Sequence, residues 1–375
     1  LQRAYYSYSL QDGWVPYSIT PPGGVPLAAE HLGGYNYNYW SFKVNGTFAS
    51  SYPTGYKLQD GDTIELVYLV NDGSEKPSDI EIVPDAPRPD YDDSAAWPGY
   101  AGGSASGPST DAKTPVDTTD LAWSSALKDS SEYSKGVSDP ILVKGDVYIA
   151  AGNTLYIKDA ATGETKKQAT LAVSINTTSR IVYADGLIVV PLSGGRLQAL
   201  TADDLVTVWL TDELPAHMTG GSQQSLTTLT VRDGCVYYGT AAADWTTSYG
   251  GYYLCVDLAT GETKWINKNS DAGYYWSGAA SAGSYLVVAD DNGVVRALDP
   301  ASGDVVASLD LGVRVRSTVI ADADGTTLYV VSNDGVLHKL SVAADGALTH
   351  AGSVKFGSSS TSTPSLTSNG KIVAC

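Results

Sequence analysis

The stretch Asp159-Ala-Ala-Thr-Gly-Glu-Thr-Lys166 decides the fold, because copies of it recur along the chain at nearly constant spacing. It returns as Asp257-Leu-Ala-Thr-Gly-Glu-Thr-Lys-Trp265 and as Asp299-Pro-Ala-Ser-Gly-Asp304, with weaker copies after Leu200 and Leu340. The anchor positions 159, 201, 257, 299 and 341 are 42, 56, 42 and 42 residues apart. A period of about 40 residues that contains several short strands is typical of the blades of a β-propeller.

Each repeat is predicted to hold four short strands. In the first repeat they span 139–144, 147–151, 155–159 and 166–173, and later repeats start near residues 181, 226, 279 and 318. Apolar runs such as Leu187–Val190 fit inner strands that are buried on both faces between packed sheets. A sixth repeat begins at Thr363 and stops after two strands, so the strand around Trp123 is expected to help close the ring. The fold class is therefore all-β, with about six four-stranded blades of which the last is incomplete.

The chain is predicted to contain two folded units. Residues 1–83 form a small β-rich unit, in which alternating apolar residues at 42–44 and 64–68 are bounded by the turn residues Asn45-Gly46 and Asp60-Gly61. Val25–Leu32 is expected to form one short helix. Residues 84–96 are rich in Pro and Asp and are interpreted as a semi-stiff linker, and residues 97–375 form the propeller.

Composition excludes several classes of partner. The 375 residues include 41 acidic and 23 basic side chains, for a formal net charge of -18. Nucleic acids and anionic lipid surfaces both require clustered Lys and Arg, so neither is an expected partner. No run of 18 apolar residues is present, so no membrane-spanning segment is expected. Because the chain begins at Leu1 without a signal-like segment, we expect a mature or trimmed form.

Three cysteines are too few for a disulfide scaffold. Cys235 and Cys255 are predicted to lie on neighbouring antiparallel strands, where either a cross-strand disulfide or two buried thiols would fit. Cys375 is the last residue and has no assigned partner.

The second unit resembles the quinoprotein-like family of propellers with PQQ-like repeats. The residues that carry the resemblance are the Asp-x-x-Thr-Gly-Glu-Thr-Lys-Trp turns, and the entry segment Trp97-Pro…Lys113-Thr-Pro…Leu121-Ala-Trp123, over about residues 97–375. Dehydrogenases of that family hold calcium with carboxylates and an Asn, and many use adjacent cysteines and a tryptophan floor under the cofactor. No such set can be matched residue by residue here, so no cofactor is expected and a quinone-dependent oxidoreductase is kept as an alternative.

The first unit resembles the transcobalamin-C-terminal-like domain of bacterial surface proteins. The matching stretches are Tyr39-Trp40…Val44-Asn-Gly46 and Leu58-x-Asp-Gly-Asp-x-Ile-Glu65. The resemblance implies a β-grasp-like fold, an exported or cell-surface protein of bacterial type, and, as an alternative function, binding of cobalamin or a related corrinoid. Tyr35, Tyr37 and Tyr39 alternate, so they are expected to line one strand face, either as a solvated surface or as a docking surface.

A candidate binding surface is predicted from loop lengths. The third repeat is 14 residues longer than its neighbours (56 against 42), and the extra residues fall near 241–252. In a four-stranded blade this insertion lies on the same face as the loops between blades. The candidate ligand-binding residues are Trp245, Tyr249, Tyr252, Tyr274, Tyr275, Trp276, Arg314, Arg316, Arg180 and His217. They would form aromatic platforms with guanidinium groups; alternatively, the aromatics pack blade edges and the arginines pair with nearby carboxylates.

No motif for catalysis stands out. The chain has neither a Gly-x-Ser-x-Gly elbow nor a phosphate-binding Gly-Lys-Thr, and its four histidines are not spaced as a metal pair. Carboxylate pairs for glycoside hydrolysis remain an alternative, because 41 acidic residues offer many pairs. The sequence therefore predicts a non-catalytic binding protein, without a metal, that recognises an extracellular ligand such as a glycan, a peptide or a small anion on the loop face of the propeller.

Overall fold

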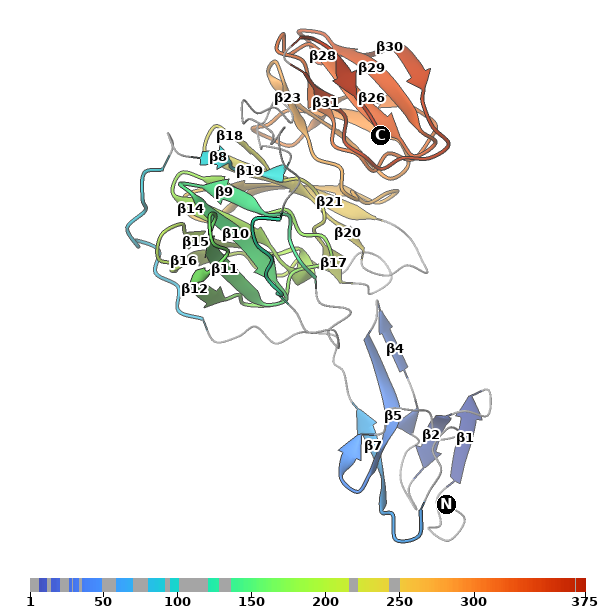
Figure 1. Ribbon diagram of the computed structural model, residues 1–375. Helices are drawn as coiled ribbons and strands as arrows, with labels where there is room; N and C mark the ends of the chain where they lie inside the picture. The colour runs from blue at the N-terminus through green and yellow to red at the C-terminus, as the bar shows by residue number, and fades with distance from the viewer. Residues whose placement is uncertain are drawn as a thin grey trace. The chain divides into compact units, whose positions relative to one another are not determined.

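The computed structural model describes residues 7–11, 15–20, 27–28, 30–33, 36–48, 59–69, 80–91, 95–100, 121–127, 136–215, 222–242, 250–367 and 369–375. The chain divides into two compact units, Leu1–Glu75 and Lys76–Cys375. The protein is all-β: its described elements are strands (Figure 1), with one 3-10 turn at Ser193–Gly195.

The first unit contains two small antiparallel sheets. One is formed by β1 (Ser7–Gln11), β2 (Val15–Thr20) and β3 (Leu27–Ala28). In the other, β5 (Asn36–Val44) pairs with β4 (Glu30–Gly33), β6 (Thr47–Phe48) and β7 (Ile64–Leu69). The predicted turn at Asn45-Gly46 is confirmed, with φ values of 51° and 81°. The helix predicted at 25–32 is wrong, because β3 and β4 lie there and form ladder hydrogen bonds with β2 and β5.

The second unit is a β-propeller built from five four-stranded antiparallel sheets in chain order, with a sixth that is only begun. The short strand β8 (Ala95–Trp97) extends blade one at its inner edge. The strands of the blades are as follows: in blade one β9 (Ile141–Val143), β10 (Asp146–Ala151), β11 (Thr154–Asp159) and β12 (Thr165–Thr170); in blade two β13 (Val182–Ala184), β14 (Leu187–Pro191), β15 (Leu197–Thr201) and β16 (Thr207–Leu210); in blade three β18 (Thr230–Arg232), β19 (Cys235–Gly239), β21 (Gly251–Asp257) and β22 (Thr263–Asn269); in blade four β23 (Ala280–Ala282), β24 (Tyr285–Ala289), β25 (Val294–Leu298) and β26 (Val305–Asp310); in blade five β27 (Ile320–Ala321), β28 (Thr327–Ser332), β29 (Val336–Val342) and β30 (Leu348–Lys355).

Two further pairs of strands complete the described part. The hairpin β31 (Ser365–Leu366) and β32 (Ile372–Val373) begins the sixth repeat. The insertion of blade three starts with β20 (Ala241–Ala242), which pairs with β17 (Gln223–Gln224) in the preceding loop. The two loops that the sequence predicted to meet on one face are therefore joined by a ladder.

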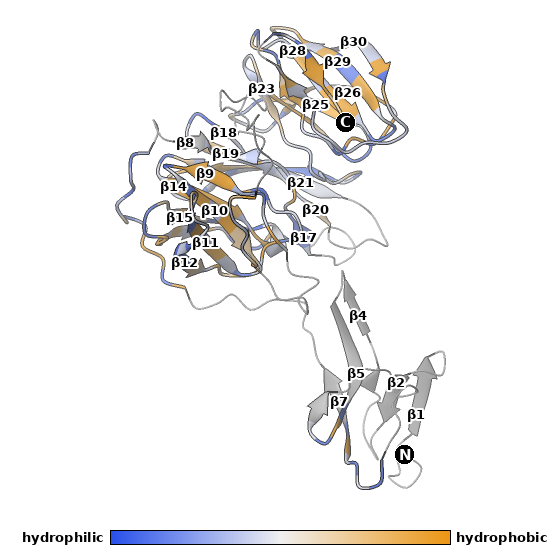
Figure 2. Ribbon diagram, in the orientation of Figure 1, coloured by the Kyte–Doolittle hydropathy of each residue, from blue (hydrophilic) through white to orange (hydrophobic). Residues whose placement is uncertain are grey.

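The core lies between consecutive blades rather than inside one sheet. One cluster of buried residues joins blades one and two, another joins two and three, a third joins three and four, and a fourth joins four and five. Strands such as β10, β14 and β28 are largely apolar, whereas many of the turns between the strands of a blade are hydrophilic (Figure 2). Face-to-face packing of twisted sheets explains why Leu187–Pro191 is buried at every position.

The repeated Asp–Gly turns act as docking sites for tryptophans from the neighbouring blade. Trp209 of β16 donates its indole N–H to the Leu258 carbonyl in the turn of blade three at 3.0 Å, and Trp265 of β22 does the same to Pro300 of blade four at 2.9 Å. Gly261 has φ 76°, and a Cβ there would lie 2.7 Å from the Trp209 ring. The turn therefore requires glycine both for its backbone conformation and for the ring that covers it.

Trp123 docks in the same way on blade one. Its indole N–H donates to the Ala160 carbonyl at 2.9 Å, and its ring covers Gly163. Residues 121–127 therefore occupy the place of an outer strand of a blade that precedes blade one. This agrees with the expectation that the Trp123 segment contributes to the sixth repeat, although these residues make no ladder of their own.

Six equivalent positions meet on one axis, which shows that the blades are arranged radially. Each lies two residues before the first strand of its sheet; together they are called the channel ring and comprise Asp139, Arg180, Thr228, Gly278, Thr318 and Thr363. Asp139 and Arg180 form a parallel bridge, the hydroxyls of Thr228 and Thr318 are 2.8 Å apart, and the Thr318 N–H donates to Thr363 Oγ1 at 3.1 Å. Contacts between blades one and two, three and five, and five and six are compatible only with sheets around a common centre.

Candidate functional site

The channel ring opens into a polar cavity of about 550 Å³, called the channel pocket. Its walls come from blades one and two, from the loop before blade four, and from the loop before β31. The lining residues are Tyr100, Asp139, Thr178, Arg180, Trp276, Ser359, Ser360, Thr361, Ser362 and Cys375. Hydroxyl groups predominate, and one guanidinium and one side-chain carboxylate supply the charge among these side chains.

Arg180 is the central group of the channel pocket. Its side chain is 10% exposed, and Nη1 donates to Thr228 Oγ1 at 2.8 Å and to the Trp276 carbonyl at 2.7 Å. The guanidinium lies 3.6 Å from the centroid of the Tyr100 ring, and Nε is 3.5 Å from a carboxylate oxygen of Asp139. Burial lowers the pKa of Arg180, while Tyr100 and Asp139 oppose that shift, and an arginine keeps its charge in such surroundings.

The hydrogen-bonding capacity of Arg180 is only partly used. Nη1 is satisfied and Nε faces Asp139, but within the described part of the chain Nη2 donates no hydrogen bond. The Asp139 side chain is 47% exposed and its contact with Nε is long, so the ion pair neutralises the buried charge incompletely. The pocket thus presents a fixed, largely buried guanidinium whose Nη2 can donate hydrogen bonds to a ligand.

Trp276 is held in an unusual backbone conformation at the same place. Its φ is 54°, in the left-handed region that bulky residues rarely adopt. The indole N–H donates to Thr178 Oγ1 at 2.7 Å, and the carbonyl accepts from Arg180 and, at 3.3 Å, from the Thr318 hydroxyl. Residues of blades two and five therefore hold Trp276, which precedes blade four, and strain that is held by surrounding contacts is concentrated at functional sites in proteins.

A second arginine supports the aromatic side of the pocket. The guanidinium of Arg316 lies 4.8 Å from the Tyr275 centroid and 5.5 Å from that of Trp276. Arg316 also makes a two-point contact with buried Asp291, through Nε at 2.6 Å and Nη2 at 3.1 Å, and Arg314 approaches the same carboxylate at 3.3 Å. The two arginines thus share one carboxylate, as the alternative interpretation of the sequence expected.

The structure brings together only some of the residues that the sequence singled out. Arg180 and Trp276 line the channel pocket, and Arg316 lies over the Trp276 ring. Tyr275 is buried in a small cluster with Leu226 and Ala241. Tyr252 packs in the core between blades two and three, and Tyr274 is fully buried against Tyr253, where burial raises its pKa to about 12. Trp245, Tyr249, His217 and Tyr35 lie outside the described residues, and Tyr37 and Tyr39 are described only by their place on β5.

Sequence reasoning missed Asp139 of the channel pocket, although a signal for the channel ring existed. A Ser or Thr precedes each channel-ring position, at 138, 179, 227, 277, 317 and 362. In blades one to five this hydroxyl bonds to the backbone of the second strand, as Ser317 does to Val331 at 2.9 and 3.0 Å. The repeated hydroxyl marks the axis, so the next residue in each repeat was predictable as a channel residue.

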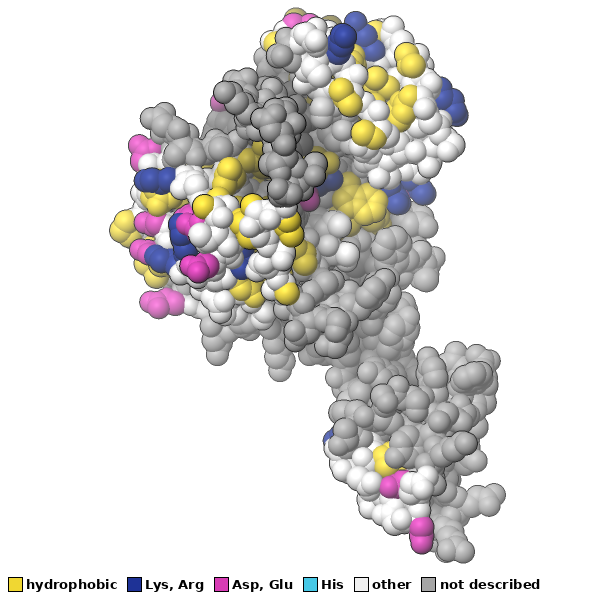
Figure 3. Space-filling view, in the orientation of Figure 1, with side chains coloured by type: hydrophobic (Ala, Val, Ile, Leu, Met, Phe, Trp, Pro, Cys, Tyr) yellow, Lys and Arg dark blue, Asp and Glu magenta, His cyan; other side chains and the backbone are white. Residues whose placement is uncertain are grey.

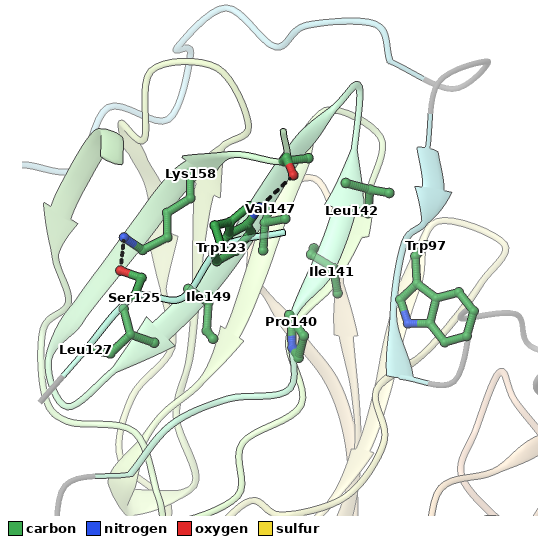
Figure 4. A pocket seen from close by; sticks show the side chains of 11 residues that line it. Trp97, Trp123, Ser125, Leu127, Pro140, Ile141, Leu142, Val147, Ile149 and Lys158 are labelled. Atoms are coloured by element: carbon green, nitrogen blue, oxygen red, sulfur yellow. Dashed lines mark hydrogen bonds between the residues drawn. The ribbon is translucent and has the colours of Figure 1, made fainter. Parts of the chain in front are cut away.

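A second cavity, also about 550 Å³, is a groove over the outer face of blade one (Figure 4). It lies between the Trp123 segment and strands β9 and β10, and its walls are mainly apolar. At one edge Lys158 donates to Ser125 Oγ at 2.9 Å. The lining residues are Trp97, Trp123, Ser125, Leu127, Pro140, Ile141, Leu142, Val147, Ile149, Lys158 and Ala160.

The described residues do not fit a calcium–quinone site of the kind that the family resemblance implies. Among them, no group of three or more His, Cys, Asp or Glu residues is placed to hold a metal ion. In the channel pocket the one side-chain carboxylate, Asp139, already faces Arg180. No reaction step is therefore assigned to such a group.

The disulfide considered between Cys235 and Cys255 is not formed. Both are buried free thiols on the neighbouring strands β19 and β21, as predicted, but Cys235 is opposite Asp257 and Cys255 is opposite Tyr237. The two thiols therefore occupy diagonal positions of the ladder rather than directly opposite ones. Burial raises the pKa of the Cys255 thiol to about 12, so it is unreactive.

Two further properties concern the charged surface and membrane-spanning helices. Acidic and basic side chains are interspersed on the visible face of the first blades (Figure 3). Lys166 pairs with both Asp146 and Asp159, at 2.5 and 2.9 Å. In the described ranges, no helix has the length and apolar character needed to cross a bilayer.

Comparison with known proteins places the repeats in a family. A family model described as "Outer membrane protein assembly factor BamB" matches residues 114–265 and 249–374. Since these matches begin at residue 114, the resemblance of the first unit to transcobalamin-like domains stays a prediction. No curated protein matches the sequence significantly.

Solved structures that resemble the chain share little of its sequence. Quinohemoprotein alcohol dehydrogenase from Comamonas testosteroni is 16% identical with a TM-score of 0.49, and the match covers 64% of this chain and 46% of that one. BamB from Moraxella catarrhalis is 18% identical with a TM-score of 0.40, covering 62% and 78%. The computationally designed Ika8 protein is 14% identical with a TM-score of 0.47, covering 62% and 66%. The chain spans less than half the length of the dehydrogenase.

Proposed function

Because the chain belongs to the family described as outer membrane protein assembly factor BamB, we propose that it is an exported or cell-surface binding protein without catalytic activity. The propeller holds six loops rigidly around one axis, and such a scaffold needs only suitable loop residues to form a binding site. The binding site of this proposal is the channel pocket. Its ligand is a peptide that presents its free C-terminal carboxylate.

The observation that carries the proposal is the buried, incompletely paired guanidinium of Arg180. Nη2 has no acceptor within the described part of the chain, and the ring of Tyr100 fixes the plane of the guanidinium from one side. A planar fork of this kind matches the two oxygens of a carboxylate. The hydroxyls of Thr178 and Ser360–Ser362 supply donors and acceptors for peptide groups, and the indole of Trp276 supplies an apolar contact.

The test is calorimetric titration with a set of acetylated tetrapeptides, each prepared with a free C-terminal carboxylate and as the amide. We expect the carboxylate forms to bind and the amides to bind at least about tenfold more weakly, because a hydrogen bond to a charged group contributes about 1.5–3 kcal/mol. Arg180→Gln should remove the difference between carboxylate and amide.

Arg232→Gln is the matched control. Arg232 also links two blades, since its Nη1 donates to Ser281 Oγ at 3.0 Å, but it is not a lining residue of the channel pocket. It should lose stability as Arg180→Gln does and keep its affinity for the carboxylate peptides. Equal binding of carboxylates and amides, or binding that survives Arg180→Gln, would contradict the proposal.

No described contact favours the alternatives that the sequence left open. A quinone-dependent oxidoreductase would develop a quinone absorption band and dehydrogenase activity after addition of pyrroloquinoline quinone and Ca²⁺. Binding of cobalamin by the first unit would shift the cobalamin spectrum on mixing. Turnover of a glycan would support a carbohydrate-active enzyme. Each of these results would replace the proposed function.

A further inference from the structure

Two histidines that are twelve residues apart face each other on blade five, away from the channel ring. His338 lies on β29 and His350 on β30, where the ladder pairs His338 with Ser353 and His350 with Leu340. His338 Nδ1 is 3.2 Å from His350 Nε2, and the ring centroids are 5.4 Å apart. His338 is buried, whereas His350 is exposed, so the pair is accessible from the side of β30.

The neighbours of His338 fix which of its ring nitrogens carries the hydrogen. The Ser332 hydroxyl donates to Asp334 Oδ1 at 2.5 Å, and the same oxygen lies 2.9 Å from His338 Nε2. A hydroxyl has one hydrogen, so the oxygen of Ser332 accepts from His338. Nε2 therefore carries the hydrogen, and the lone pair of Nδ1 is directed towards His350.

We propose that His338 and His350 form a binding site for a divalent transition-metal ion of the zinc, nickel and copper group. Imidazole nitrogens are preferred ligands of these ions. Two nitrogens bound tetrahedrally to one zinc ion at about 2.0–2.1 Å lie about 3.3 Å apart, and the separation in this structure is 3.2 Å. With the hydrogen of His350 on Nδ1, both facing nitrogens carry lone pairs, and water completes the coordination on the exposed side.

The surroundings of His338 have a further property of a metal ligand. The other ring N–H of a ligating histidine usually donates to an oxygen acceptor, which fixes the tautomer and the orientation of the ring. Ser332 Oγ accepts from His338 Nε2 and is itself held by its hydrogen bond to Asp334.

This inference does not depend on the proposed function of the channel pocket. It is tested on the untagged full chain by calorimetric titration with ZnCl₂ and by the visible spectrum after addition of CoCl₂, which reports imidazole coordination of the ion. We expect one Zn²⁺ ion to bind per chain and a Co²⁺ spectrum that Zn²⁺ abolishes. His350→Gln should weaken Zn²⁺ binding at least about tenfold, and Ser332→Ala about tenfold through the orientation of His338.

The control is His31→Gln, which removes a histidine of the other unit and should leave the Zn²⁺ affinity unchanged. His338→Gln is the second ligand variant, and its folding is checked by the unfolding transition because the residue is buried. If the wild-type chain binds no Zn²⁺, or if His350→Gln binds it as tightly, the two rings form a hydrogen-bonded pair only and the proposal is overturned.

Discussion

The rim of the propeller, where tryptophans cover the Asp–Gly turns, repeats the same residues from blade to blade, whereas the axis does not. At the rim, the same residue types recur, as in the tryptophans of β16 and β22, which both lie over a glycine of the next blade. At the axis, the six positions of the channel ring are equivalent in structure but carry different residues, and only Asp139 and Arg180 are charged. The repeated residues of the rim therefore specify the fold, and the varied residues of the channel ring distinguish this chain from other propellers.

The largest loss of stability is expected when a repeated residue of the rim is replaced. Trp209→Ala removes a buried ring and its hydrogen bond to Leu258, and large-to-small changes of this kind cost about 3–5 kcal/mol in free energy of unfolding. Lys167 lies at the equivalent place in blade one and pairs with exposed Asp204, so Lys167→Ala should change stability far less. Chemical denaturation of both variants checks this, and equal losses would show that the position rather than the ring matters.

A smaller loss of stability is expected when a residue of the channel ring is replaced. Thr318→Val removes the hydroxyl that contacts Thr228 at 2.8 Å and accepts from the Gly278 N–H at 3.2 Å. A buried N–H left without an acceptor costs about 1–3 kcal/mol, and the same denaturation measurement reports it. Thr318→Ser keeps the hydroxyl and serves as the control; a loss as large as that of Val would contradict the hydrogen bonds as the origin of the effect.

The smallest expected effect is the pH dependence of the stability that Asp159 contributes to the rim turn of blade one. Asp159 accepts hydrogen bonds from Lys166 and from the N–H groups of Thr162 and Ala161, which lower its pKa to about 2. A folded-state pKa below the unfolded value of about 3.9 gives stability that is present above that value and is lost as the pH falls through about 2. The unfolding midpoints of wild type and Asp159→Asn should therefore differ at pH 6 and converge near pH 2. A constant difference would contradict this origin.

How far the sequence predicted the structure depended on whether a feature is repeated. The strand bounds of blade one and the turns at Gly163, Gly261 and Gly303 followed from the period, because each copy reinforced the others. Tyr252 and Tyr274 were selected for their loop neighbourhood, yet both are core residues. In a propeller the inner strands are buried on both faces, so alternation along a strand does not separate a core aromatic from an accessible one.

The site itself was predicted only in part, for a related physical reason. Arg180 and Trp276 were selected from loops, but their contact links residues 96 apart, and no local pattern reports such a pair. The histidine pair of blade five was also missed, because metal-pair spacing was sought along a single element whereas the hairpin joins two strands. The serine or threonine before each channel-ring position is the signal that would have located the axis.

The 2.8 Å contact between the hydroxyls of Thr228 and Thr318 has a consequence for how the blades can move. The contact joins blade three to blade five, which share no sheet edge. Neither blade can tilt away from the axis without losing this hydrogen bond, so their movements are coupled without passing through blade four.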